Sequence, residues 1–324
     1  MQPPDFWTSD GGLARLLDPI GRAVGAITTR RARAMPQTRV GAPVISIGGL
    51  TVGGSGKTPV AMSICAKLRA RHQSPAIVLR GYRGSETGPL AVDLNTHTAS
   101  AVGDEALLHA VHTPTWVARR RAAGAQAAIA GGANVIVLDD GHQHPGIARD
   151  LSLVVVDGRT AFGNGRIFPA GPLREAVADG LARADAVVIV GDDTRGLTRR
   201  FAPMLPVLHA DLVPGPEHIG LRGQRVVAFA GIGDPRKFFA TLRDFGAQVV
   251  ATHPFADHYA FDVTDVQPIL DEAFSLGAIP VTTAKDAVRL APDQRQQVNV
   301  LSVDVAWRDE AALEQLLDRV APST

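Results

Sequence analysis

Early in the chain lies a glycine-rich segment whose residue types suit the binding of phosphate groups. It reads Thr51-Val-Gly-Gly-Ser-Gly-Lys-Thr58, follows a short apolar run and precedes a helical pattern. Glycines allow successive backbone N–H groups to face inward around phosphate oxygens, and the helix start adds the positive end of a dipole. The spacing is that of G-x-x-x-x-G-K-T, except that Thr51 replaces the first glycine, so the next two glycines are expected to supply the lost flexibility. The segment predicts a nucleotide site formed by Thr51, Gly53, Gly54, Ser55, Gly56, Lys57 and Thr58.

Two side chains of this loop would have separate tasks. Lys57 would contact the β- and γ-phosphates, and the Thr58 hydroxyl would coordinate Mg²⁺. A second feature fits this metal, because Asp139 and Asp140 end the apolar run Val135–Leu138. A carboxylate at the end of such a strand can belong to the shell of Mg²⁺, whereas the alternative is a turn with solvated acids. Because a phosphate loop lies upstream, we predict that Thr58, Asp139 and Asp140 are metal ligands.

Candidate groups for proton transfer occur at two other places. Asp104 and Glu105 open a predicted helix, where either acid could simply favour the helix end electrostatically. A kinase also needs a carboxylate to accept the proton of the attacking hydroxyl. His258 belongs to a polar turn after a later strand, and it could orient or tune that carboxylate across a domain cleft. The alternative for His258 is a turn whose polar groups satisfy one another.

Further polar side chains are candidates for contact with a substrate. Tyr82 and Arg174 lie in loops that follow strands and carry arginines suited to phosphate recognition. His142 and His144 have a spacing compatible with metal ligation. Because Mg²⁺ prefers oxygen ligands, substrate contact or local hydrogen bonding is expected for both histidines.

The elements that must position these side chains alternate between strands and helices. Short apolar runs separated by helical patterns predict a mainly parallel sheet covered on both faces. A proline-rich linker interrupts the pattern, and a second alternating unit begins near Gln224. We therefore predict two domains, residues 1–215 and residues 222–324, with a last helix able to pack back on the first. Two extended pieces, residues 207–212 and 298–305, are expected to pair as a small ribbon between the domains.

The N-terminal segment has a different pattern, an amphipathic helix with one apolar stripe and a basic opposite face. The aromatic pair Phe6-Trp7 precedes it, and Asp18 followed by Pro19 would allow the helix to start there. Such a helix suits a membrane interface, and a helix packed on its own domain is the alternative. The stripe consists of Leu13, Leu16, Leu17, Ile20, Val24 and Ile27, opposite Arg15, Arg22 and Arg33.

Composition excludes several classes of protein. Lys and Arg number 33 against 32 Asp and Glu, so the net charge of +1 does not indicate a general nucleic-acid binder. Cys65 is the single cysteine, which excludes an internal disulfide or a cysteine-based metal site, and we expect it in the core. No stretch reaches the ~20 apolar residues of a membrane span, and no signal-peptide pattern is visible.

Taken together, these motifs resemble the lipid A disaccharide 4'-kinase (tetraacyldisaccharide 4'-kinase) family over most of the chain. The resemblance implies an α/β fold of two α/β/α units, with a P-loop NTPase-like N-terminal domain, a smaller C-terminal domain and the site between them. It implies transfer of the ATP γ-phosphate to the 4'-hydroxyl of a tetraacylated glucosamine disaccharide 1-phosphate, giving lipid IVA, at the cytoplasmic face of the bacterial inner membrane. The segments that carry it are residues 47–59, 80–84, 102–105, 138–144, 169–175, 230–233, 257–259 and 283–287.

The same resemblance implies roles for individual residues. Asp104 would act as the base, assisted by His258, and Lys57 would hold phosphate. The implied cofactors are ATP and Mg²⁺, and the implied partners are the acylated disaccharide 1-phosphate and the membrane surface; no nucleic-acid or protein partner is predicted. Mg²⁺ would be held by Thr58, Asp139 and Asp140, and the substrate contacted by Tyr82, His144 and Arg174.

Two other functions fit the motifs. A soluble ligase or small-molecule kinase with the same loop would have no use for the amphipathic N-terminus. A nucleotide-switched binding protein would need only the acid at the strand end, and Asp104 and His258 would lie far apart in it. The distance between those two residues therefore separates the alternatives.

Overall fold

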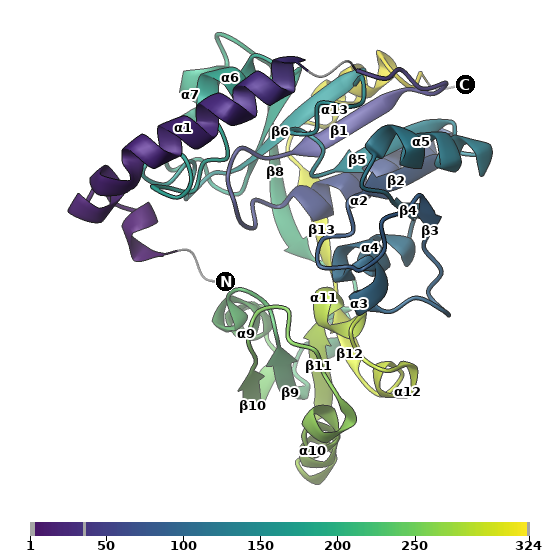
Figure 1. The fold of residues 1–324 in the computed structure, drawn as a ribbon. Helices are drawn as coiled ribbons and strands as arrows, with labels where there is room; N and C mark the ends of the chain where they lie inside the picture. Colours follow the sequence, from purple (N-terminus) through teal and green to yellow (C-terminus); the bar gives the residue numbers. More distant parts are fainter. Residues whose placement is uncertain (1–3, 35–36, 323–324) are drawn as a thin grey trace.

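The computed structural model describes residues 4–34 and 37–322, and its largest element is a nine-stranded sheet (Figure 1). The strand order is β13-β8-β7-β6-β1-β5-β2-β4-β3. The pairs are parallel except at the two edges, where β13 pairs with β8 and β3 pairs with β4 in antiparallel fashion. The strands are β1 (Val44–Gly48), β2 (Pro75–Leu79), β3 (Leu90–Ala91), β4 (Thr115–Val117), β5 (Val135–Asp139), β6 (Leu151–Asp157), β7 (Ala186–Val190), β8 (Val207–Pro214) and β13 (Val303–Trp307).

The central strands of this sheet are buried on both faces, as expected for parallel strands. Every residue of β1, β2, β5 and β7 is buried. Apolar side chains of one face form a core with three helices, and those of the other face form two cores with three further helices. The first set is α2 (Lys57–Ala70), α4 (Asp104–Ala110) and α13 (Glu310–Asp318), and the second is α5 (Arg121–Ala130), α6 (Val177–Leu181) and α7 (Leu197–Phe201).

A smaller sheet of four parallel strands, in the order β10-β9-β11-β12, lies below the larger one in Figure 1. A core with α9 covers one face, and a core with α10 covers the other. The short helix α11 packs on α4 of the larger unit. The elements are β9 (Arg225–Ala230), α9 (Pro235–Asp244), β10 (Gln248–Pro254), α10 (Val263–Ser275), β11 (Ile279–Thr283), α11 (Ala284–Ala287) and β12 (Asn299–Leu301).

The predicted α/β class with two mainly parallel sheets is confirmed, but the predicted ribbon is wrong in part. β8 does pair with β13, yet the pair forms the edge of the nine-stranded sheet, and β12 joins the smaller sheet instead. The segment 298–305 is thus divided between two sheets. The boundary between residues 1–215 and 222–324 stays a prediction. β13 and α13 belong to the second of these ranges, yet they return to the larger unit. The remaining short elements are η1 (Asp5–Trp7), α3 (Ala99–Val102), α8 (His218–Leu221) and α12 (Pro292–Arg295).

The N-terminal helix α1 (Gly12–Ala34) runs through Pro19, so the predicted start at that proline is wrong. Ala14, which precedes Pro19, and Gly21 and Gly25, which follow it, are all buried. The helix is therefore held by contacts both before and after the proline. A Cβ at position 21 would lie 2.4 Å from the carbonyl oxygen of Ile167, so only glycine permits this close approach. Small residues therefore form the inner face of α1.

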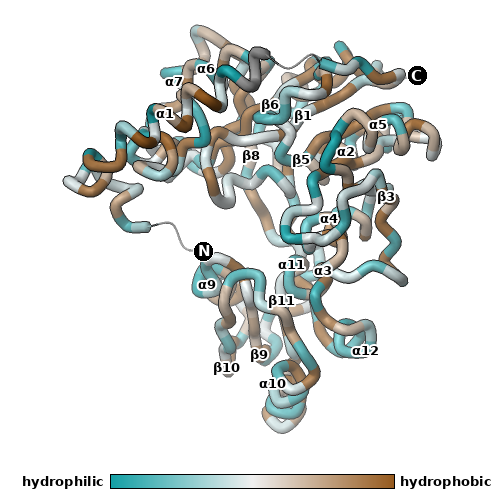
Figure 2. The backbone as a smooth tube through the Cα atoms, viewed as in Figure 1, coloured by the Kyte–Doolittle hydropathy of each residue, from teal (hydrophilic) through white to brown (hydrophobic). Residues whose placement is uncertain are grey.

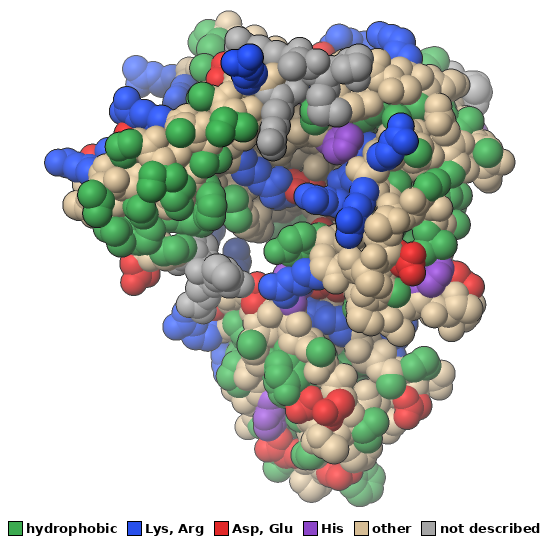
Figure 3. Space-filling view, in the orientation of Figure 1, with side chains coloured by type: hydrophobic (Ala, Val, Ile, Leu, Met, Phe, Trp, Pro, Cys, Tyr) green, Lys and Arg blue, Asp and Glu red, His purple; other side chains and the backbone are tan. Residues whose placement is uncertain are grey.

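Most of the large apolar residues of α1 are exposed, whereas Leu17 is half-buried. Leu16 is 73% exposed, and Ile20 and Ile27 are each 54% exposed. Figure 2 shows brown segments along the α1 tube, and Figure 3 shows hydrophobic side chains gathered over this helix. Among the described residues, no helix has the length and apolar character needed to cross a membrane.

We expect Gly21→Ala to loosen α1, although alanine has the higher helix propensity by about 1 kcal/mol. The added methyl group would meet a backbone oxygen that cannot move independently of its loop. Hydrogen exchange of the α1 amides should become faster. Gly12→Ala is the control, since nothing lies within 4 Å of a Cβ at position 12. Equal exchange in both variants would contradict this packing.

Candidate active site

The glycine-rich loop connects the buried end of β1 with the first turn of α2. Gly56 is the N-cap of α2 with a φ of +88°, a conformation that favours glycine. The Lys57 Nζ donates to the Gly53 carbonyl at 3.2 Å, which places the amine over the loop. Backbone N–H groups of the loop, the start of a 14-residue helix and this amine together form a site suited to the phosphates of a nucleotide.

Thr51, which replaces the first glycine of the pattern, lies in an extended segment held by a neighbouring loop. It forms an antiparallel bridge with Leu173, and the Val52 N–H donates to the Pro172 carbonyl at 2.8 Å. The Arg174 N–H donates in turn to the Leu50 carbonyl at 2.7 Å. An extended residue needs no glycine, which explains why threonine is tolerated here.

Asp139 at the end of β5 lies against this loop. Its Oδ2 accepts from the Thr58 hydroxyl at 3.0 Å and lies 2.8 Å from Nε2 of His109. Burial alone would raise the pKa of Asp139, but the hydrogen bond and charge of His109 and the charge of Lys57 outweigh burial and lower it. The carboxylate is therefore charged at neutral pH.

Asp140 faces two cations. Its Oδ1 lies 3.8 Å from Lys57 Nζ, and its Oδ2 lies 2.7 Å from a guanidinium nitrogen of Arg174. The φ of Asp140 is +54°, in the left-handed region. Arg174 also donates to Gln143 at 3.3 Å, and Gln143 donates to the buried Glu175 at 3.0 Å. These contacts join the phosphate loop to the loop after residue 170.

The residues around Asp139 fit a magnesium ion. The Oδ1 atom of Asp139 is buried, and this atom has no hydrogen-bond partner among the described residues. Mg²⁺ is usually held by one or two carboxylates, a hydroxyl and nucleotide phosphates rather than by a cage of protein ligands. Accordingly, the part of the chain that the structure describes has no cluster of three or more His, Cys, Asp or Glu suited to a metal.

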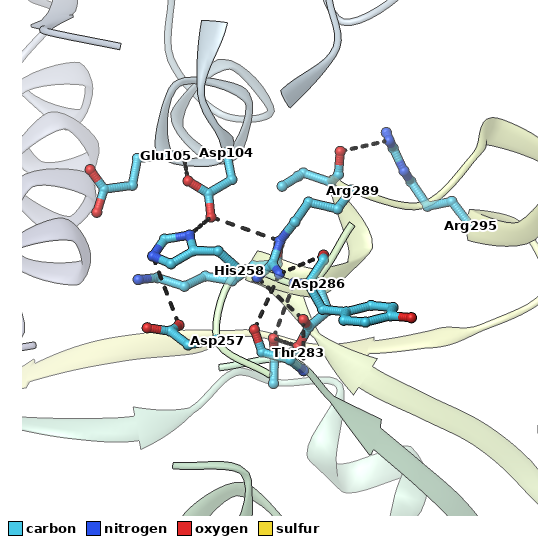
Figure 4. A network of polar contacts seen from close by, with 12 residues as sticks. Asp104, Glu105, Asp257, His258, Thr283, Asp286, Arg289 and Arg295 are labelled. Atoms are coloured by element: carbon cyan, nitrogen blue, oxygen red, sulfur yellow. Dashed lines mark hydrogen bonds and ion pairs between the residues drawn. The ribbon is translucent and has the colours of Figure 1, made fainter. Parts of the chain in front are cut away.

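Asp104, the first residue of α4, meets the smaller unit at this site (Figure 4). Its Oδ2 lies 2.7 Å from Nδ1 of His258, which follows β10, and 3.7 Å from Nε of Arg289. Gly103 permits the turn before α4, because its φ is +88° and a Cβ there would lie 2.6 Å from the Tyr82 carbonyl oxygen. The alternative function, a nucleotide-switched binding protein, led us to expect Asp104 and His258 far apart, and that expectation is wrong.

Neighbouring charges determine the ionisation of Asp104. Burial alone would raise the pKa of Asp104, but the hydrogen bond and charge of His258, with the charges of Arg289 and Lys285, outweigh burial and lower it. Asp104 is therefore charged at neutral pH and accepts a hydrogen bond from His258. The pKa of the adjacent Glu105 is raised, first by burial and then by the negative charge of nearby carboxylates.

The other predicted substrate residues lie outside these contacts. His142 is buried between the Ser152 hydroxyl at 3.1 Å and the Gly180 carbonyl at 2.9 Å, and burial lowers its pKa to about 3, so its role is local hydrogen bonding. His144 is half-buried, and Tyr82 is 59% exposed. Within residues 4–34 and 37–322, no hydrogen bond or ion pair joins Tyr82 or His144 to the carboxylates of the site.

Sequence reasoning missed several residues of the site. His109 contacts Asp139 from five positions beyond Asp104, and only its place on the same predicted helix could have drawn attention to it. Arg289 follows the segment 283–287, and no pattern indicated that it would reach Asp104.

Comparisons with known proteins show the family of the chain. A family model described as Tetraacyldisaccharide-1-P 4'-kinase matches residues 13–321. The chain is 54% identical to the tetraacyldisaccharide 4'-kinase of Rhodospirillum rubrum over 99% of this chain and 98% of that protein. It is 50% identical to that of Paramagnetospirillum magneticum, covering 99% of each.

A solved structure adds the same result at the level of fold. The chain superposes on LpxK from Aquifex aeolicus in complex with ATP with a TM-score of 0.76 and 27% identity, covering 95% of this chain and 99% of that chain. The phosphate loop, the acids at the end of β5 and the match over nearly the whole length lead to one conclusion: the chain belongs to the tetraacyldisaccharide 4'-kinase family.

Proposed function

We propose that this protein transfers the γ-phosphate of ATP to the 4'-hydroxyl of a tetraacylated glucosamine disaccharide 1-phosphate, giving lipid IVA. The observation that carries the proposal is the contact of Asp104 with His258 at the start of α4, the helix that also contacts Asp139. A charged, buried carboxylate in this place can accept the proton of an attacking hydroxyl. The α4 helix connects it to the loop, because His109 of α4 contacts Asp139, and Asp139 contacts Thr58.

The reaction exchanges one phosphorus–oxygen bond for another. The 4'-hydroxyl oxygen attacks the γ-phosphorus, the bond to the oxygen shared with the β-phosphate breaks, and ADP leaves. The hydroxyl proton passes to Asp104, while His258 donates a hydrogen bond that orients this carboxylate. Lys57 and the backbone N–H groups of the loop stabilise the charge on the transferred group.

Thr58, Asp139 and Asp140 are the residues that would hold Mg²⁺, which supplies charge neutralisation at the β- and γ-phosphates when bound. The buried Oδ1 of Asp139, which has no hydrogen-bond partner within the described residues, supports this assignment. Asp140 keeps its ion pairs with Lys57 and Arg174 at the same edge. Positioning and charge stabilisation, rather than covalent chemistry, then provide the catalysis.

The acceptor would approach from the side of α1. A cavity of about 710 Å³ beside this helix is lined by Arg22, Thr29, Ile167 and Ala176, among others. Basic and apolar groups together suit a phosphorylated, acylated sugar. Figure 3 shows further Lys and Arg side chains around the hollow between the two units. Arg174, His144 and Tyr82 are proposed to contact this substrate.

The exposed apolar side of α1 supports attachment to a lipid surface, which we place at the cytoplasmic face of the bacterial inner membrane. A helix held by small residues, with its large side chains outward, can bury those side chains in the interfacial region. A soluble ligase or small-molecule kinase would leave this surface without a use. The attachment would be peripheral or monotopic.

Transfer of labelled γ-phosphate to a defined acylated disaccharide 1-phosphate tests the proposal, with water as the only acceptor in the control. We expect Asp104→Asn to lower kcat about 10²–10⁴-fold while ATP affinity changes little, because the amide cannot accept the proton. Asp271→Asn, an exposed change on α10, should leave both unchanged. Equal losses of turnover and ATP affinity in the Asp104 variant would contradict its role as base.

The pH dependence of His258→Ala gives a second test. In the native protein the lowered pKa keeps Asp104 ionised well into acid. Without His258, burial is opposed by fewer charges, so the pKa of Asp104 should rise and the acid limb of kcat/KM should move to higher pH. His258→Asn keeps a donor near Nδ1 and should move the limb less. An acid limb at the same pH in the alanine variant would be inconsistent with this pairing.

Membrane attachment is tested by Leu16→Ser combined with Ile20→Ser. Co-sedimentation with vesicles of phosphatidylethanolamine and phosphatidylglycerol should fall at least about tenfold, because buried apolar area drives interfacial binding. The matched control is Ile219→Ser with Phe274→Ser, since these side chains are 72% and 90% exposed elsewhere on the surface. If the control pair loses as much binding, α1 is not the attachment site.

A further inference from the structure

His109 is a buried histidine for which the proposed reaction has no direct use. Its side chain is 0% exposed, and it lies on α4 with Nε2 at 2.8 Å from Asp139 Oδ2. Its Nδ1 has no hydrogen-bond partner among the described residues. An unpaired buried ring nitrogen costs about 1–3 kcal/mol, so an apolar side chain would fill this place at lower cost. The contact with Asp139 is therefore what a histidine at this position provides and an apolar side chain would not.

The contact constrains which oxygen of Asp139 remains available. Oδ2 accepts from two sides, from the Thr58 hydroxyl at 3.0 Å and from His109. Two donors from different elements, the phosphate-loop helix and α4, hold the carboxylate in one orientation. Oδ1 is left buried without a hydrogen-bond partner in the described part of the chain. Oδ1 is thus the oxygen of Asp139 that is available to coordinate a cation.

The same helix carries the proposed base. Asp104 and His109 are five residues apart on α4, a rise of about 7.5 Å along the helix axis. Asp104 is held from the other unit by His258 and Arg289. One short helix therefore connects the group that receives the proton with the carboxylate beside Thr58.

We propose that His109 is a positioning residue that orients Asp139 for Mg²⁺, and that α4 thereby sets the position of the base relative to the metal. This inference rests on the proposed function, in which Asp139 is a metal ligand. Partners that orient metal ligands typically contribute 10- to 100-fold to metal affinity. His109 acts through Asp139 and touches neither the nucleotide nor the acceptor.

The test measures binding of Mn²⁺ by electron paramagnetic resonance, with the full chain and a non-hydrolysable ATP analogue. His109→Leu and His109→Asn should weaken Mn²⁺ binding about tenfold or more. His109→Gln should stay within about threefold of the native protein, because its amide nitrogen reaches the place of Nε2. Affinity for the analogue in EDTA should be unchanged in all three, since the contact acts on the metal ligand.

Two further variants separate the possible outcomes. Leu108→Ala removes a buried side chain of α4 and should lower thermal stability without weakening Mn²⁺ binding, which excludes a merely structural effect. Asp139→Asn should weaken Mn²⁺ binding at least as much as His109→Leu. If Asp139→Asn binds the ion normally, the proposed metal site fails. If only the Asp139 variant loses affinity, while His109→Leu or His109→Asn, whichever folds, binds normally, the role of His109 is overturned and the proposed function stands.

Discussion

The site depends on a buried carboxylate that one unit supplies and the other keeps charged. Asp104 begins α4 of the larger unit, whereas His258 and Arg289 belong to the smaller unit. A buried charge without partners would be strongly destabilising, so the two units must meet here for the carboxylate to remain ionised. Arg289 is itself held by Asp286 at 3.2 Å and by the carbonyls of Gly231 and Tyr259, so the cation is fixed before it meets Asp104. The proposed base is therefore held at the contact between the units.

Sheet topology brings the remaining groups to the same place. β1 lies between β5 and β6, and the chain places β2 to β5 on one side of β1 and β6 to β8 on the other. Ligands of open parallel sheets bind at the carboxyl ends of strands where the order reverses in this way. The phosphate loop follows β1 and Asp139 ends β5, so their neighbouring strand ends explain the contact of Asp139 with Thr58.

The small and the large side chains of the N-terminal helix α1 have different surroundings. Gly21 and Gly25 allow α1 to lie close to Ile167, and the larger apolar residues are thereby left outside. An apolar stripe packed inward would have been the ordinary way to hold an amphipathic helix on its domain. Here small residues of α1 face the protein, most of the apolar stripe is exposed, and a cavity adjoins the helix.

By itself, the sequence determined the features that depend on local pattern. The spacing of glycines before Lys57 and Thr58, the apolar run before Asp139 and the alternation of strands and helices all reflect chemistry within a few residues. Only the tertiary structure decided the contacts between distant residues: His109 with Asp139, Arg289 with Asp104, and His142 as a buried hydrogen-bonding residue. The physical reason is that these contacts follow from how helices and strands pack, and residues 30 to 185 positions apart leave no periodic signal of their proximity along the chain.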